Sequence, residues 1–246
     1  MLPRLRFGML TPSSNTVLEP VTAALLRDLP EVSAHFARFK VTEIALSDAA
    51  LGQFDFGPIL AAAELLAHAK VDVIAWNGTS ASWLGLERDR ELCRRIEAAT
   101  GIQACTAVLA FDEVFRRTGV RSLGLVTPYR DDVQAQIASN FAANGYPCTV
   151  ERHLGIQDNF SFGLVTEAQV EDMCRATAAA RPDALAIVCT NVRAADVASR
   201  LESELSLPIY DSVAVTVWKC LGMVGLAPSR LASWGRLFVD PRLQPD

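Results

Sequence analysis

The sequence lacks the features of a nucleic-acid-binding, membrane-spanning or disordered chain. Its 246 residues carry 23 Lys and Arg against 28 Asp and Glu, and no segment gathers enough basic residues to follow a phosphate backbone. No apolar run approaches the roughly 18 residues that cross a bilayer, and the first residues contain no signal-peptide core. Because 50% of the residues are hydrophobic, disorder is excluded. We expect a soluble cytoplasmic protein with no nucleic-acid or membrane partner.

Metal-site spacing is also missing. The six cysteines are spread along the chain with no two in C-x-x-C spacing, and the three histidines lie far from them in sequence. We therefore expect no metal site. In a reducing compartment, such scattered cysteines are mostly small buried hydrophobic residues.

Short apolar runs alternate with longer stretches of helical period along the whole chain. Strands are expected at residues 5–10, 36–41, 71–76, 103–105, 123–126, 148–152, 184–188 and 208–210. Helices are expected at residues 18–29, 58–69, 84–99, 107–118, 133–144, 167–180, 194–205 and 213–222. Strands and helices in alternation predict an α/β fold with mostly parallel sheets that helices cover on both faces.

The two halves of the chain repeat one another. Residues 7–12 match 123–128, residues 72–79 match 183–190, and Ile102 matches Ile209, all at nearly constant spacing. This pattern indicates two copies of one βα unit. It predicts two Rossmann-like lobes with four-stranded parallel sheets, related by pseudo-two-fold symmetry. We assign residues 1–119 together with 212–246 to the first lobe and residues 120–211 to the second.

The repeat also identifies the loops of a cleft between the lobes, because ligands of open parallel sheets bind at the carboxyl ends of strands. These loops are residues 11–16, 78–83, 127–129 and 189–192. In the first, Pro12, Ser13 and Asn15 bring a hydroxyl, an amide and backbone N–H groups before a helix. Such a segment suits a carboxylate or phosphate, although the same residues are common helix caps.

The other loops add further polar groups. Gly78, Thr79 and Ser80 offer two hydroxyls and an unobstructed backbone, and Tyr129 offers a phenol. Cys189 differs from the other five cysteines because it ends a strand, faces the predicted cleft and precedes a helix whose amides can stabilise a thiolate. It is the candidate acid/base or nucleophile. The adjoining Thr190 is a candidate for substrate binding.

Together these residues resemble a known family. The segment Pro12-Ser13-Ser14-Asn15-Thr16, the turn Thr127-Pro128-Tyr129, the pair Asp158-Asn159 and the strand-end Cys189 are similar to the maleate cis-trans isomerase and arylmalonate decarboxylase branch of the aspartate/glutamate racemase superfamily. The resemblance spans nearly the whole chain. It implies a site between two pseudo-symmetric lobes, a small dicarboxylate as ligand and chemistry next to a carboxylate without a cofactor, and it leaves a homo-oligomer open.

One departure from the family pattern favours one of its activities. Members that racemise or isomerise typically carry a cysteine on each lobe, whereas the repeat aligns Cys189 with Gly78. Gly78-Thr79-Ser80-Ala81-Ser82 resembles the loop of arylmalonate decarboxylases, which keep one cysteine and use this loop in a dioxyanion hole. The resemblance thus implies a decarboxylase. Thr79, Ser80 and Tyr129 would hold one carboxylate of a substituted malonate, and Cys189 would protonate the enediolate that remains.

Two alternatives stay open. The resemblance implies that Asn15 and Asn159 contact substrate carboxylates, which would make the second carboxylate's pocket polar and favour a maleate isomerase or racemase-type enzyme with one cysteine. Phe160 and Phe162 could supply an apolar wall instead. A chain without the first cysteine could also be a non-catalytic, carboxylate-binding relative.

Overall fold

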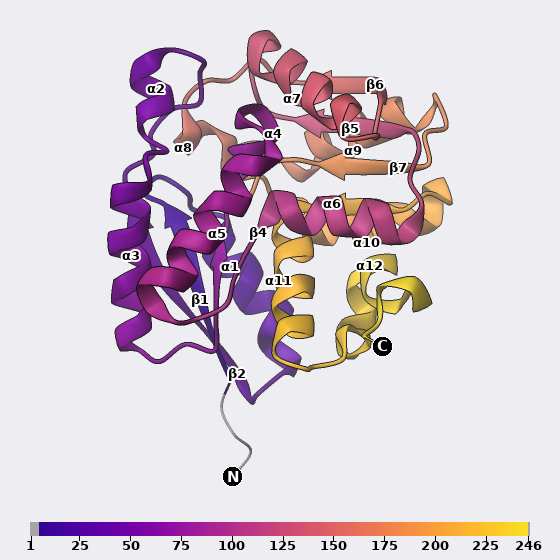
Figure 1. Cartoon of the computed structure of the whole chain (residues 1–246). Helices are drawn as coiled ribbons and strands as arrows, with labels where there is room; N and C mark the ends of the chain where they lie inside the picture. The colour runs from indigo at the N-terminus through magenta and orange to yellow at the C-terminus, as the bar shows by residue number, and fades with distance from the viewer. Residues whose placement is uncertain (1–4, 246) are drawn as a thin grey trace.

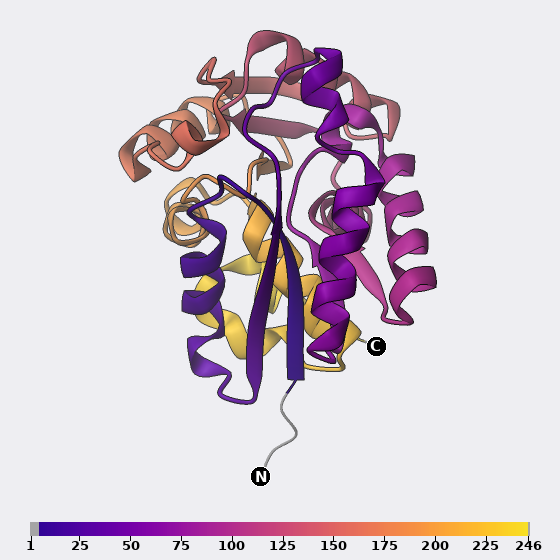
Figure 2. The ribbon, with the colours of Figure 1, turned by 90° about the vertical axis from the view of Figure 1, so that its left-hand side faces the viewer.

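The structure, a computed structural model, describes residues 5–245 and contains two four-stranded parallel sheets (Figures 1 and 2). The first has the order β2-β1-β3-β4, with β1 Leu5–Pro12, β2 Val32–Phe39, β3 Val73–Trp76 and β4 Ala104–Thr106. The second has the order β6-β5-β7-β8, with β5 Leu123–Thr127, β6 Cys148–His153, β7 Ala184–Ile187 and β8 Ile209–Asp211. The equal strand order confirms the predicted α/β fold of two similar sheets. The residue boundaries assigned to the lobes stay a prediction.

Helices connect and cover the strands. They are α1 Leu18–Leu25, α2 Asp48–Gly52, α3 Phe56–His68, α4 Ala81–Leu84, α5 Leu86–Thr100, α6 Ala107–Thr118, α7 Asp131–Ala143, α8 Asn159–Phe162, α9 Glu167–Ala178, α10 Ala195–Leu205, α11 Ser212–Met223 and α12 Arg236–Val239. Short 3-10 turns lie at η1 Leu26–Asp28, η2 Pro228–Trp234 and η3 Pro241–Leu243. None of the helices within residues 5–245 combines the length and apolar character that a membrane span needs.

Several predicted boundaries differ from the structure, each for a local reason. The helix expected at residues 84–99 is split into α4 and α5 by Gly85, whose φ of 96° no helix can contain. The strand expected from residue 36 begins at Val32, because its half-buried residues pair with β1 throughout. Sequence patterns did not reveal α2 and α8, which begin at the side-chain caps Ser47 and Asp158.

Two helices pack on the sheet to which their preceding strand does not belong. Helix α6 follows β4, yet its Phe115 packs on Phe141 of α7 and Tyr210 of β8, with ring centroids 6.0 and 6.1 Å apart. Helix α11 follows β8, yet contacts α1, β3 and β4 of the first sheet. In Figure 1, α11 runs beside the first sheet and α6 below the second. The tail after α11 completes this region, where the indole N–H of Trp218 donates to the carbonyl of Leu243 at 3.0 Å.

The two halves of the repeat have a glycine at the same position of a central strand. Gly8 in β1 and Gly124 in β5 occupy equivalent places, and side chains from a neighbouring helix and from the chain entering or forming the next strand crowd both. A Cβ at Gly124 would lie 2.4 Å from Cδ2 of Leu185 and 2.6 Å from Cγ2 of Thr177. Glycine is therefore required there for helix α9 to approach the sheet closely.

We expect Gly124→Ala to lower the free energy of unfolding by about 1–3 kcal/mol, because the added methyl overpacks a filled core. Gly57→Ala is the matched control, since a Cβ there meets nothing within 4 Å. Because Gly57 is an exposed residue of helix α3, alanine there should be neutral or stabilising by up to about 1 kcal/mol. Urea unfolding of the two variants measures the difference, and equal effects would contradict the packing argument.

Candidate active site

A small cavity lies where the carboxyl ends of β3 and β7 approach the turn after β5. Most of the site residues expected from the sequence line it, namely Pro12, Gly78, Thr79, Ser80, Tyr129, Asn159, Cys189 and Thr190. Its volume is about 20 Å³, which is room for about one water molecule. The structure thus brings together groups from both sheets in a closed arrangement.

Two expected site residues do not line the cavity. The Oγ of Ser13 accepts from the N–H of Val41 at 3.1 Å. Asn15 is buried, and its Oδ1 accepts from the N–H groups of Val17 and Leu18, both at 2.9 Å. Its amide nitrogen donates to Oγ1 of Thr190 at 3.1 Å. Asn15 therefore caps the start of α1 and supports Thr190 from behind.

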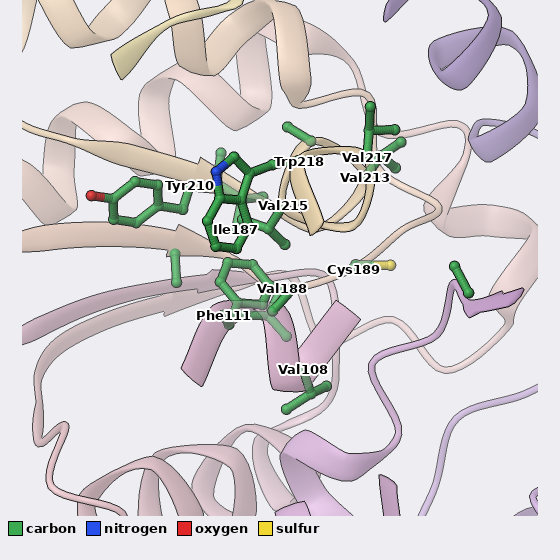
Figure 3. Close-up of a cluster of buried hydrophobic side chains, with 14 of the residues drawn as sticks. Val108, Phe111, Ile187, Val188, Cys189, Tyr210, Val213, Val215, Val217 and Trp218 are labelled. Carbon is green, nitrogen blue, oxygen red and sulfur yellow. The ribbon is translucent and has the colours of Figure 1, made fainter. Parts of the chain in front are cut away.

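Cys189 lies just after β7, which ends at Ile187, at the point where the buried core meets the cavity. Figure 3 shows its sulfur directed away from the hydrophobic cluster formed by residues such as Val188 and Phe111. Its backbone N–H donates to Oγ of Ser212 at 3.0 Å, and Ser212 in turn donates to the carbonyl of Ile187 at 2.9 Å. These bonds hold the strand end, and so the thiol, in a fixed place.

The electrostatics of Cys189 favour the neutral thiol. The side chain is only 2% exposed, and burial raises its pKa to about 12. The Tyr129 hydroxyl and the N–H of Asn191, which donates to Sγ at 3.4 Å, act in the opposite direction. Asp211, whose own pKa burial raises to about 7, pushes the thiol pKa further up when it is charged. Cys189 therefore carries its proton at neutral pH and can donate it.

One end of the cavity is rich in hydrogen-bond donors. The hydroxyls of Thr79 and Tyr129 lie 2.7 Å apart, and Oγ of Ser80 accepts from the indole of Trp76 at 3.4 Å. Gly78, Thr79 and Ser80 are buried, and no hydrogen bond within residues 5–245 uses their backbone N–H groups. Consecutive buried N–H groups left free in this way form a binding place for an anion such as a carboxylate.

The cavity also has an apolar wall, of which only Trp83, as part of the loop 78–83, was anticipated from the sequence. The wall consists of Val41, Ile44, Phe54, Trp76 and Trp83. Val41, Ile44 and Phe54 belong to the segment between β2 and α3, which contains only the short helix α2, and no periodic pattern marks a functional role there. Trp83 packs edge-on against Phe54 and Tyr129 with ring centroids 5.6 and 5.5 Å away.

Hydrogen bonds from distant parts of the chain close the cavity over this wall. The carbonyl of Thr42 accepts from the N–H of Asn159 at 2.9 Å, and the N–H of Ile44 donates to Gln157 at 2.9 Å. The hydroxyl of Ser14 donates to the carbonyl of Val41 at 2.6 Å. A dicarboxylate needs more room than this cavity offers, so part of its lining must move for one to enter. We expect this part to be residues 41–54, which belong to neither sheet.

A further residue that the sequence did not single out ties the site together. Asn191 is buried, and its Oδ1 accepts from the N–H of Thr16 at 2.9 Å while its amide donates to the carbonyl of Asn159. Its place directly after Cys189 and Thr190 was the only available signal. Phe160 is half exposed, whereas Phe162 packs behind the Tyr129 ring, so neither forms the apolar wall.

Metal ligands do not gather at this site. In the part of the chain that the structure describes, no three His, Cys, Asp or Glu side chains come close enough to hold an ion. The polar groups at the cavity are hydroxyls, amides and one thiol. Such a set suits the neutral hydrogen bonding of a carboxylate.

Comparison with known proteins gives consistent matches over the whole chain. The sequence profile of the arylmalonate decarboxylase family matches residues 16–238. An arylmalonate decarboxylase of Bordetella bronchiseptica is 27% identical over 234 residues, which cover 94% of this chain and 95% of that protein. A maleate isomerase of Geobacillus stearothermophilus is 23% identical over 237 residues, which cover 92% of this chain and 94% of that protein. The crystal structure of the maleate isomerase Iso from Pseudomonas putida S16 has the same fold. Its TM-score is 0.88 at 22% identity, and the match covers 96% of this chain and 98% of that one.

Proposed function

Because the chain belongs to the arylmalonate decarboxylase family, we propose that it is a cofactor-independent decarboxylase of a substituted malonate, with Cys189 as the proton donor. The match confirms the family resemblance seen in the sequence, and the relatives are named as decarboxylases and maleate isomerases. The observation that carries the choice between them is the state of Cys189. It is a buried thiol with its pKa raised to about 12, which suits an acid better than a nucleophile.

The donor-rich end of the cavity supports this chemistry. One carboxylate of the malonate would accept hydrogen bonds from the free N–H groups of Thr79 and Ser80 and from the Tyr129 hydroxyl. The bond from the α-carbon to the other carboxylate breaks, CO₂ leaves, and the electron pair passes into an enediolate on the held carboxylate. Donors already in place there stabilise the developing charge, each by about 3 kcal/mol.

Proton transfer completes the reaction. The Cys189 thiol gives its proton to the α-carbon, which forms the new C–H bond, and the resulting thiolate regains a proton from water. The product is a monocarboxylate, and one proton is consumed for each CO₂ released. Burial favours the neutral thiol, so the protein environment also favours reprotonation of the Cys189 thiolate.

The apolar wall gives the departing carboxylate its place. A carboxylate beside Val41, Ile44 and Phe54 loses much of its hydration, which favours its release as neutral CO₂. The amides expected to make this pocket polar are engaged within the protein: Asn15 bonds to Thr190, and Nδ2 of Asn159 donates to Ser14 at 2.7 Å.

Maleate isomerisation is the second candidate, favoured by Asn159 at the cavity and by the similarity to maleate isomerases. A mass-resolved assay without added metal or cofactor separates the two. We expect loss of CO₂ from methylmalonate and no conversion of maleate. Conversion of maleate to fumarate would overturn the decarboxylase proposal in favour of the isomerase, and tight binding of dicarboxylates without turnover would indicate a binding protein.

The pH dependence tests the role of the thiol. A general acid works below its pKa and fails as the pH rises through it, so an ordinary thiol would lose activity near pH 9.0, whereas Cys189 should remain active to about 12. We expect kcat/KM for CO₂ release to show no falling limb between about pH 8 and 10. Alkylation of Cys189 by iodoacetamide at pH 9 should be slower than that of glutathione. A falling limb near pH 9 would contradict the proposed role.

A further inference from the structure

Trp76 lies in an unusual place for a core tryptophan. It ends β3, is only 1% exposed, and yet lines the cavity. Its indole N–H donates to Oγ of Ser80 at 3.4 Å, and its ring packs on Phe39 with centroids 5.0 Å apart. Because Trp76 belongs to the sheet, movement of residues 41–54 does not by itself displace it.

The indole fills the space beside Gly78. A Cβ built on Gly78 would lie 2.0 Å from Cζ2 of Trp76 and 2.4 Å from its Cε2, distances that no real side chain tolerates. In the sequence repeat Gly78 aligns with Cys189, so the two residues hold equivalent positions in the two halves of the chain. The indole ring of Trp76 therefore occupies the volume that a side chain at position 78 would need.

We propose that Trp76 is the specificity-determining residue of the cavity and restricts it to malonates whose α substituent is small, such as hydrogen or methyl. The inference rests on the proposed decarboxylase function. A ring held by Phe39 and Ser80 excludes larger groups by steric clash, which is one of the ways in which a binding site discriminates between ligands. An aryl substituent would have to displace the indole.

The position of the ring is tested without any substrate. Gly78→Ala should lower the midpoint of thermal unfolding by several degrees in the wild-type background, because the new methyl meets the indole. In a Trp76→Leu background the same substitution should cost almost nothing. Equal losses in both backgrounds would show that the ring does not fill this space and would overturn the inference.

Selectivity is measured as the ratio of kcat/KM for methylmalonate to that for phenylmalonate. We expect a ratio on the order of 100 or more in the wild-type protein, and at least a tenfold lower ratio in Trp76→Leu. Trp218→Leu is the matched control, because Trp218 is equally buried but does not line the cavity. It should lose stability and leave the ratio unchanged.

The outcomes separate this inference from the proposed function. A wild-type protein that decarboxylates phenylmalonate as readily as methylmalonate contradicts the size limit and leaves the decarboxylase in place. An unchanged ratio in Trp76→Leu likewise contradicts the role of Trp76 and leaves the decarboxylase proposal in place. A protein that neither decarboxylates nor is thermally stabilised by any malonate contradicts both.

Discussion

Replacing Cys189 with serine is expected to lower kcat/KM for CO₂ release from methylmalonate by about 10²–10⁴-fold, the range that general acids contribute. A serine hydroxyl is a far weaker acid than a thiol, so the enediolate would be protonated by water and this step would be slower. Binding should change little, because the donors proposed to hold the carboxylate lie on the loop of Thr79 and Ser80. Isotope-resolved CO₂ release and calorimetric titration with malonate measure the two effects.

Cys174→Ser provides the control for this substitution. Cys174 is fully buried in α9 and away from the cavity, so its replacement tests the cost of placing a hydroxyl in the core. It should lower stability and leave the rate per folded molecule unchanged. Full activity of Cys189→Ser would remove the thiol from the mechanism.

Tyr129→Phe is expected to lower kcat by about 10²–10³-fold with a small change in KM, as removal of one oxyanion donor typically does. The hydroxyl lies 2.7 Å from that of Thr79 and acts on the Cys189 thiol, so in the proposed reaction it would stand where the enediolate charge develops. Steady-state kinetics of folded protein, checked by circular dichroism, measure the loss.

A matched tyrosine separates catalysis from packing. The Tyr146 hydroxyl bonds to Asp112 at 3.0 Å, and the buried side chain lies outside the cavity lining. Tyr146→Phe should therefore lower stability by the loss of one hydrogen bond, about 0.5–1.5 kcal/mol, and leave kcat unchanged. An equal loss in both variants would show that the Tyr129 effect is structural.

The sequence predicted the fold well where burial is complete. All four residues of β7 are buried, so its apolar run is continuous and easily recognised. Strand β2 lies at the edge of its sheet with half-buried residues, and its start depends on pairing with β1, which no local pattern encodes. Helices α2 and α8 are too short for periodicity to reveal them.

The site was predictable only where the repeat could point to it. Strand-end residues such as Gly78, Tyr129 and Cys189 were located because parallel strands bring their carboxyl ends to one edge. The apolar wall was not, because Val41 and Phe54 reach the cavity through bonds such as that between Thr42 and Asn159, more than a hundred residues apart. Trp76 could be seen only as the last residue of a buried strand.

The exchange of α6 and α11 between the sheets has a consequence for folding. Residues 212–223 pack on α1 and β3, so the first sheet gains part of its cover from near the carboxyl end of the chain. During synthesis the first half would therefore emerge with an apolar face still open, a state prone to aggregation. Contacts of such long sequence separation also slow folding. We therefore expect the two sheets to complete their cores together and to fold as one cooperative unit.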